Sequence, residues 1–246
     1  MRLTRIYVPA PLRAGSEITL PTQAGGHLTR VLRLAAGAPF VMFNGEGGEY
    51  AAEISATGKQ VRSHVLRHDP IERESPLAIT LLQGVARGER MDLIVQKATE
   101  LGVARIVPVL AERSVVKVDP KQRERKREHW QSIVVSACEQ CGRNRVPAVH
   151  DVVSLGDALK GLPEDGTRCL LAADATASLA QVAARTPGAP LVLLIGPEGG
   201  LADHEDKLAQ AHGFISCRLG PRIMRTETAG LAALAALQAV AGDFRL

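Results

Sequence analysis

The stretch that decides the fold is LVLLIGPEGG, residues 191–200. Its first half, Leu191–Ile195, is an unbroken aliphatic run, which is typical of a strand buried on both faces of a parallel sheet. Three glycines and Pro197 follow at once, and they predict a tight turn whose backbone can approach a ligand closely. Asp203 is then suited to cap a helix over residues 204–211.

A second turn of the same kind follows the last predicted strand, residues 214–219. The sequence there continues as GPRIMR, residues 220–225, and leads into a helix over 226–240 made largely of Ala and Leu. A helix that is apolar nearly all round is typical of a buried or interface position. Because ligands of open parallel sheets lie beyond the carboxyl ends of strands, the two turns predict one common site.

The chain before residue 191 repeats the order of strand and helix. Residues 77–83 form an apolar strand, and residues 89–101 carry apolar side chains at helical spacing before Gly102 ends the helix. Further strands are expected at 106–110 and 169–173, and a long helix at 123–140. This alternation predicts an α/β domain with a mostly parallel sheet flanked by helices.

The N-terminal part is predominantly β. Short strands are expected at 5–9, 17–20, 40–43, 49–54 and 61–66, with one short helix at 27–34. Short strands with one helix indicate a small β-barrel. A charged, proline-bracketed segment follows, so we expect one domain over 1–70, a linker over 71–77 and a second domain over 78–246.

Composition limits the classes of protein to which the chain can belong. The chain has 246 residues, a net charge of +4 and only 3% aromatic residues. So few aromatic side chains exclude base stacking as the main route to a nucleic acid, whereas mild basicity is compatible with a polyanionic partner. No signal peptide or membrane span is recognisable, and four cysteines suit a reducing compartment, so a cytoplasmic location is expected.

The two glycine-rich turns, with TETA at 226–229, resemble the RsmE family of 16S ribosomal RNA methyltransferases, in the SPOUT superfamily. Supporting segments agree with this resemblance: QKATELGV at 96–103, ACEQCGR at 137–143, HLTRVLR at 27–33 and FNGEG at 43–47. The resemblance covers nearly the whole chain. The two C-terminal motifs are specific in combination.

The resemblance implies a fold and an activity. The fold would be a SPOUT-type, trefoil-knotted sheet preceded by a PUA-like β-barrel that binds RNA. The enzyme would be a homodimer with its active site between subunits. It would use S-adenosyl-L-methionine to methylate N3 of a uridine in 16S ribosomal RNA of the small ribosomal subunit, without a metal ion or a membrane.

The resemblance also implies roles for particular residues. The expected cofactor-binding residues are Gly196, Pro197, Glu198, Gly199, Gly200, Leu219, Gly220, Ile223, Met224, Thr228 and Ala229. We expect glycine at such positions because a side chain would occupy ligand space. The expected catalytic residues are Arg225, Arg222 and Glu139, and the expected RNA-binding residues are Arg5, Arg13, Arg30, Arg33, Arg143 and Arg145.

Some of these residues have a second interpretation. The two arginines of the 220–225 turn could stabilise a uridine anion or form salt bridges with neighbouring carboxylates. Glu198 or Glu227 could accept a proton or only brace a loop. The basic run at 121–127 could contact phosphate or form a solvated face paired with Glu124 and Glu128.

Other chemistries fit the sequence less well. Cys138 and Cys141 form a C-x-x-C motif, but no second pair or histidine completes a zinc set, and the motif lies near the end of a helix. A nucleotide-dependent oxidoreductase is disfavoured because no pyrophosphate fingerprint is present. A non-catalytic RNA-binding assembly factor is the other alternative, and the intact glycine turn and the 225–229 run argue against it.

Reversing the charges of Arg30 and Arg33 to glutamate is predicted to weaken binding to a 16S ribosomal RNA fragment. The salt dependence of binding should also become shallower, because fewer phosphate counterions are released. Filter binding across a series of salt concentrations measures both effects. Affinity that matches the wild type at every salt concentration would contradict the assignment.

Overall fold

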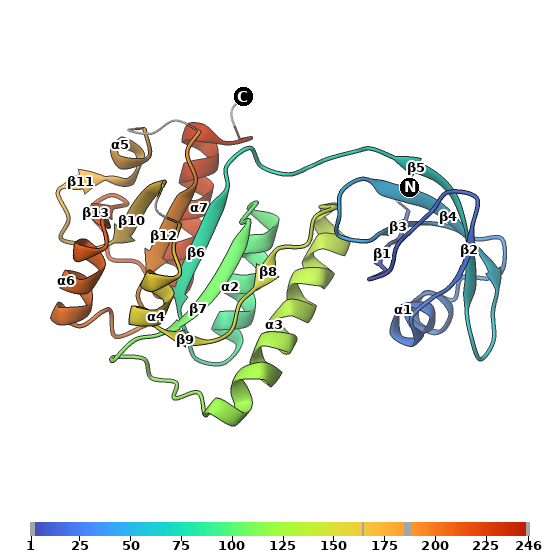
Figure 1. Cartoon of the computed structure of the whole chain (residues 1–246), viewed down its shortest axis with the longest axis horizontal. Helices are drawn as coiled ribbons and strands as arrows, with labels where there is room; N and C mark the ends of the chain where they lie inside the picture. Colours follow the sequence, from blue (N-terminus) through green and yellow to red (C-terminus); the bar gives the residue numbers. More distant parts are fainter. Residues whose placement is uncertain (1–2, 164, 185–187, 245–246) are drawn as a thin grey trace. The chain divides into compact units, whose positions relative to one another are not determined.

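The computed structural model describes residues 3–163, 165–184 and 188–244 (Figure 1). The chain forms two compact units. The first comprises Met1–Glu74 together with Cys138–Val146, and the second comprises Ser75–Ala137 with Pro147–Leu246. The segment 138–146, at the end of a long helix, thus belongs to the N-terminal unit.

The first unit is built on a five-stranded sheet. Its elements are β1 (Arg5–Tyr7), β2 (Glu17–Thr19), α1 (Thr22–Gly26), a π-helical turn η1 (His27–Val31), β3 (Pro39–Phe43), β4 (Glu49–Ala56) and β5 (Arg62–Asp69). The strand order is β1-β3-β4-β5-β2, with β1 and β3 parallel and the other neighbours antiparallel. The five predicted strands are confirmed, with ends that differ by a few residues.

The helix predicted at 27–34 begins earlier in the structure. Helix starts at Thr22 and runs through Gly25 and Gly26, two residues that are poor helix formers and that sequence reasoning treats as breakers. A Cβ on Gly25 would lie 2.9 Å from the Cβ of Val61. Glycine is therefore present because α1 packs very closely on the chain before β5, a contact that the local sequence does not reveal.

A buried ionic network joins the segment 138–146 to the sheet of the first unit. Arg5 is 7% exposed; it forms an ion pair with Glu49 and donates to Asn144 Oδ1 at 2.6 Å. Glu49 also accepts a hydrogen bond from Arg73 at 2.8 Å. Burial alone would raise the pKa of Glu49, but the hydrogen bonds from the two arginines outweigh it, so its pKa lies below the ordinary value.

The second unit is an α/β domain around a parallel sheet. Its elements are β6 (Ile79–Gly84), α2 (Glu89–Glu100), β7 (Arg105–Leu110), α3 (Pro120–Cys141, whose last turn belongs to the first unit), β8 (Ala148–Val149), β9 (Val153–Ser154), α4 (Leu155–Lys160), β10 (Thr167–Leu171), β11 (Ala177–Ser178), α5 (Leu179–Ala183), β12 (Leu191–Ile195), α6 (Asp203–Ala211), β13 (Ile215–Arg218) and α7 (Thr226–Ala241). The order is β11-β13-β10-β12-β6-β7-β8, with β9 also on β7, and every pair is parallel. The prediction of a mostly parallel α/β sheet is confirmed.

Helices cover both faces of this sheet. Val192 and Leu194 of β12 share a buried cluster with Leu155 of α4 and Ala209 of α6. Because side chains alternate along a strand, Ile195 points to the opposite face, where it lies beside Gly230 of α7. In Figure 1 α7 runs along β6 and β12, the two central strands.

The start of α6 differs from the prediction. Asp203 is the first helical residue, and the N-cap position is Ala202. The buried carboxylate of Glu205 replaces a capping side chain, since it accepts hydrogen bonds from the N–H groups of Ala202 and Glu112, both at 2.9 Å. Glu205 therefore satisfies the helix start and holds the loop after β7 beside it.

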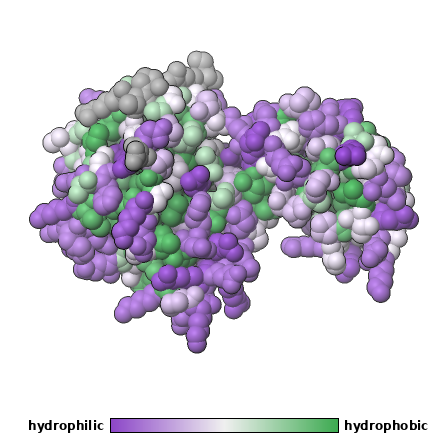
Figure 2. All heavy atoms as spheres, viewed as in Figure 1, coloured by the Kyte–Doolittle hydropathy of each residue, from purple (hydrophilic) through white to green (hydrophobic). Residues whose placement is uncertain are grey.

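The surface shown in Figure 2 is largely hydrophilic, with hydrophobic patches between polar side chains. No helix in the described ranges is long and apolar enough to span a membrane.

Replacing Glu49 with glutamine is predicted to destabilise the first unit by about 3 kcal/mol, because Arg5 keeps its buried charge without a full counter-charge. Amide hydrogen exchange within residues 3–74 should speed up, while unfolding of the second unit, followed by the fluorescence of Trp130, should change little.

The same network predicts a pH dependence. A carboxyl whose folded pKa is depressed contributes stability above its ordinary value of 4.5 and loses it as the pH falls through the folded value. As the pH falls below 4.5, the backbone amides of the first unit should therefore lose protection from hydrogen exchange in the wild type. They should lose less of it in Glu49→Gln. Equal pH profiles would contradict this role for Glu49.

Candidate active site

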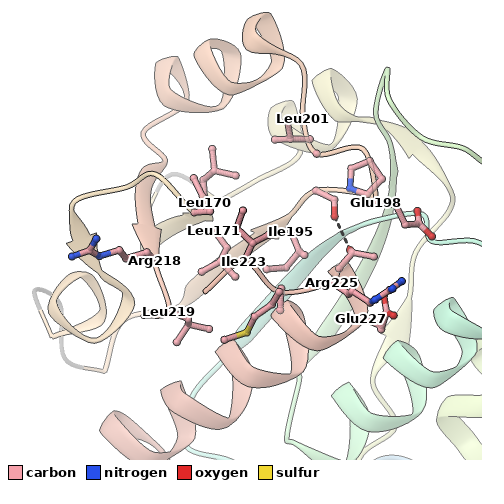
Figure 3. Close-up of a pocket in the computed structure, with 18 of the residues that line it drawn as sticks. Leu170, Leu171, Ile195, Glu198, Leu201, Arg218, Leu219, Ile223, Arg225 and Glu227 are labelled. Atoms are coloured by element: carbon pink, nitrogen blue, oxygen red, sulfur yellow. Dashed lines mark hydrogen bonds between the residues drawn. The ribbon is translucent and has the colours of Figure 1, made fainter. Parts of the chain in front are cut away.

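A cavity of about 540 Å³ opens at the carboxyl ends of β10, β12 and β13 (Figure 3). Both glycine-rich turns line it, so the expected juxtaposition of residues 196–200 with 219–225 is what the structure shows. The lining residues beyond these turns are Arg90, Leu170, Leu171, Ala172, Ala173, Ile195, Leu201, Asp206, Arg218, Thr226, Glu227 and Ala229.

The hydroxyl of Thr226 joins three segments behind this cavity. It donates to the backbone carbonyl of Gly196 at 2.6 Å and accepts from Nε2 of Gln83 at 2.9 Å. Gln83, at the end of β6, is completely buried, and Thr226 is 6% exposed. Since a buried polar group costs free energy unless it is paired, these bonds fix the turn after β12 against the start of α7.

The glycines of the two turns are required for different reasons. Gly200 and Gly220 have φ values of +70° and +71°, and a Cβ at either position would meet nothing within 4 Å, so backbone conformation is the requirement there. At Gly196 a Cβ would lie 3.2 Å from the backbone nitrogen of Leu201. The turn itself thus leaves little room for a side chain at Gly196, and the expectation that a ligand also occupies this space stays a prediction.

The lining of the cavity combines apolar and charged residues. Its apolar members include Leu170, Leu171, Ile195 and Leu201 (Figure 3). Glu198, Arg225 and Glu227 gather on one side of the view, and Arg218 lies on the other. Such a cavity matches a ligand with a flat apolar part and several polar groups.

Glu198 is held as an anion. Burial would raise its pKa, but the backbone N–H of Arg87 (3.0 Å) and the guanidinium of Arg90 (3.2 Å) outweigh burial, so its pKa lies below the ordinary value. A carboxylate stabilised in this way is a weak proton acceptor. Of its two interpretations, the geometry favours the loop brace.

Asp206 is a lining residue that sequence reasoning missed. It lies on α6, and its pKa is raised by burial and by the nearby charges of Asp174, Asp203 and Glu205. Its position in the helix after the glycine motif carries no recognisable signal, because surface helices commonly begin with acidic residues.

Family comparisons agree with this geometry. A model of the RNA methyltransferase domain matches residues 73–238, and a model of the RNA methyltransferase PUA domain matches residues 20–65. Ribosomal RNA small subunit methyltransferase E from Bacillus subtilis is 36% identical over 220 residues, covering 86% of this chain and 85% of that protein. The chain belongs to the ribosomal RNA small subunit methyltransferase E family.

Two solved structures are similar over almost their whole length. Ribosomal RNA small subunit methyltransferase E from Neisseria gonorrhoeae, bound to S-adenosylmethionine, has a TM-score of 0.92 and 38% identity, covering 99% of this chain and 100% of that chain. A methyltransferase from Legionella pneumophila, also in complex with S-adenosylmethionine, has a TM-score of 0.91 with the same identity and coverage. The family expected from the sequence is thereby confirmed.

The structure brings most of the expected family site residues together. Ten of the eleven expected cofactor-binding residues line the cavity, and the exception, Thr228, is exposed on α7. Arg222 and Arg225 also line it, and both are exposed. Glu139 lies in the first unit, where it accepts a hydrogen bond from the N–H of Tyr7 at 2.9 Å; burial raises its pKa despite that bond. Its catalytic role stays a prediction.

The expected RNA-binding arginines divide into two groups. Arg13, Arg30, Arg33 and Arg145 are exposed, although Arg145 forms an ion pair with Glu72 at 3.4 Å. Arg5 and Arg143, in contrast, are 7% and 6% exposed and form ion pairs with Glu49 and Glu74. We correct the expectation for these two, because a buried and paired guanidinium cannot also meet an RNA phosphate without breaking the network that holds it.

The cysteine motif occupies the last turn of α3. Burial raises the pKa of Cys138 to about 12, which disfavours the thiolate that metal binding and nucleophilic attack require. Within residues 3–163, 165–184 and 188–244, no cluster of three or more His, Cys, Asp or Glu side chains could hold a metal ion.

Replacing Thr226 with valine is predicted to lower both stability and affinity for S-adenosylmethionine. The change leaves the Gly196 carbonyl and part of the Gln83 amide unpaired, which should cost about 1–3 kcal/mol of unfolding free energy. Calorimetric titration should show a cofactor Kd raised about tenfold.

Thr99→Val is the matched control for this change. Thr99 is also buried, and its hydroxyl donates to a carbonyl of its own helix, Val95 O at 2.8 Å. Its replacement should leave cofactor affinity unchanged. If both variants bind the cofactor equally well, the proposed link from Thr226 to the cavity is refuted.

Proposed function

We propose that this protein transfers the methyl group of S-adenosyl-L-methionine to N3 of a uridine in 16S ribosomal RNA of the small ribosomal subunit. The observation that carries the proposal is the meeting of both glycine-rich turns at one cavity of about 540 Å³. It stands in a chain whose relatives from Neisseria gonorrhoeae and Legionella pneumophila were solved with that cofactor.

The residues of the cavity fit this cofactor. Leucine and isoleucine side chains at 170, 171, 195 and 201 suit the adenine ring, and the main-chain groups of the turns 196–200 and 219–224 suit its polar edges and the ribose. Ala229 would lie against the ligand as a small apolar contact. The cofactor, when bound, supplies a methyl group on a positively charged sulfur.

The protein must also stabilise the uridine as its N3 proton leaves. Arg225 occupies the N-cap position of α7, and Arg222 lies three residues earlier in the same turn; both guanidiniums are exposed beside the cavity. A positive charge held near the base favours the anion that forms there. Within the described part of the chain, the ion pairs around the cavity are formed by Arg90 and Arg113 and involve neither of these arginines, which favours the catalytic interpretation over a structural salt bridge.

The exposed arginines of the first unit, Arg13, Arg30, Arg33 and Arg145, would contact the RNA phosphates, and Arg30 and Arg33 lie within the residues that the PUA-domain model matches. We further propose a homodimer with a trefoil-knotted second unit, acting in the cytoplasm. Ile223 supports the dimer, because this residue beside the cavity is 86% exposed and a second copy of the chain would cover it.

A non-catalytic assembly factor is the competing function. Decay of the activity would leave the cofactor turns free to change, yet Gly196, Gly200 and Gly220 keep the geometry described above.

Mass spectrometry of 16S ribosomal RNA from cells lacking this protein tests the function. One N3-methyluridine should disappear, reappear with the wild-type chain, and stay absent with Arg225→Ala because its guanidinium no longer stabilises the anion. Lys160→Ala, an exposed residue of α4, serves as the control that restores methylation.

Two results would overturn parts of the proposal. Unchanged methylation in the deletion strain would reject the function as a whole. Full restoration by Arg225→Ala would reject only the role of that arginine.

A further inference from the structure

Arg90 contacts both the turn at 196–200 and the start of α7 from a third segment of the chain. It is the second residue of α2, and its Nη1 lies 3.2 Å from Oε1 of Glu198 in the turn after β12. Its Nε lies 3.7 Å from Oε1 of Glu227 in the first turn of α7. The three side chains all line the cavity.

The two carboxylates need a cation at this place. Their side chains are only 20% and 16% exposed, so water screens their mutual repulsion weakly. In addition, Oε2 of Glu198 and Oε2 of Glu227 are buried and have no hydrogen-bond partner among the described residues. Two partly desolvated like charges repel, and the guanidinium of Arg90 is the cation that contacts both of them.

We propose that Arg90 is a positioning residue that holds the turn at 196–200 and the start of α7 at the spacing the cofactor requires. The inference rests on the proposed function, because it takes the cavity as the S-adenosylmethionine site. Arg90 itself acts through Glu198 and Glu227: it offsets their repulsion and ties the turn at 196–200 to the start of α7. Thr226 links the same two segments through its hydroxyl, and Arg90 adds a second link through Glu198 and Glu227.

The role is separable from folding. The side chain of Arg90 is 42% exposed, whereas α2 is anchored by Met91, Ile94 and Val95, which are buried to 1% exposure or less. The helix therefore keeps its core contacts when the guanidinium of Arg90 is removed. A planar guanidinium reaches two carboxylates at once, and lysine keeps the charge while losing part of that geometry.

The test compares Arg90→Met, Arg90→Lys and the double variant Arg90→Met/Glu227→Gln by calorimetric titration with S-adenosylmethionine. Arg90→Met should raise the Kd about tenfold, Arg90→Lys should recover most of the affinity, and the double variant should also recover because the repulsion is gone. In turnover assays, Arg90→Met should raise KM for the cofactor about tenfold while kcat stays within about threefold.

Lys97→Met is the matched control. Lys97 lies on the same helix, is 41% exposed and pairs with Glu100 at 2.8 Å, away from the residues that line the cavity. The Kd of the Lys97→Met variant for S-adenosylmethionine should equal that of the wild type. The melting temperatures of all variants should stay close together.

The outcomes separate the two proposals. If the wild type itself binds no S-adenosylmethionine, the proposed function fails. If the wild type binds and Arg90→Met binds equally well, or if Glu227→Gln does not recover the loss, the positioning role of Arg90 is overturned while the function stands.

Discussion

The hydroxyl of Thr226 is the interaction on which the site depends. Through its bonds to Gln83 and Gly196, it joins the end of β6, the turn after β12 and the start of α7, although Gln83 lies more than one hundred residues before the other two. Parallel strands deliver their carboxyl ends to one edge of the sheet, but they do not determine how the following turns meet. The hydroxyl of Thr226, which donates one hydrogen bond and accepts another, fixes how these segments pack together. The cavity lies beside it.

Charge is distributed around this cavity according to burial. The carboxylates of Glu198 and Glu227 are partly desolvated and paired with Arg90, whereas Arg222 and Arg225 are exposed. The carboxylates have a structural partner in Arg90. In the function proposed above, the exposed arginines would keep their charge available for a polyanionic substrate, and one cavity would combine a pocket for a cofactor with a basic entrance for RNA.

Much of this architecture was predictable because its signals are local. An aliphatic run such as Leu191–Ile195 and the helical spacing of 89–101 report burial directly, and the two turns carry their own glycines. The two-residue strands β8, β9 and β11 were missed because so short a segment has no periodicity. Gln83, Arg90 and Asp206 were missed as site residues for a different reason, since their roles come from neighbours more than one hundred positions away or from another layer of the fold.

The arginines are a second example of structural roles that the sequence alone does not reveal. Arg5 and Arg30 belong to similar basic segments, yet one is buried against Glu49 and the other is exposed. The sequence shows each positive charge but not which carboxylate pairs with it. Charge alone therefore could not distinguish a structural ion pair from an RNA contact.

The most direct measurement of the central claim is a nuclear magnetic resonance titration of the isotopically labelled protein with S-adenosylmethionine. Main-chain recognition by the two turns predicts that the largest shifts of backbone amide resonances fall within residues 196–200 and 219–229. Saturable binding that leaves those amides unmoved and perturbs another region would contradict the account.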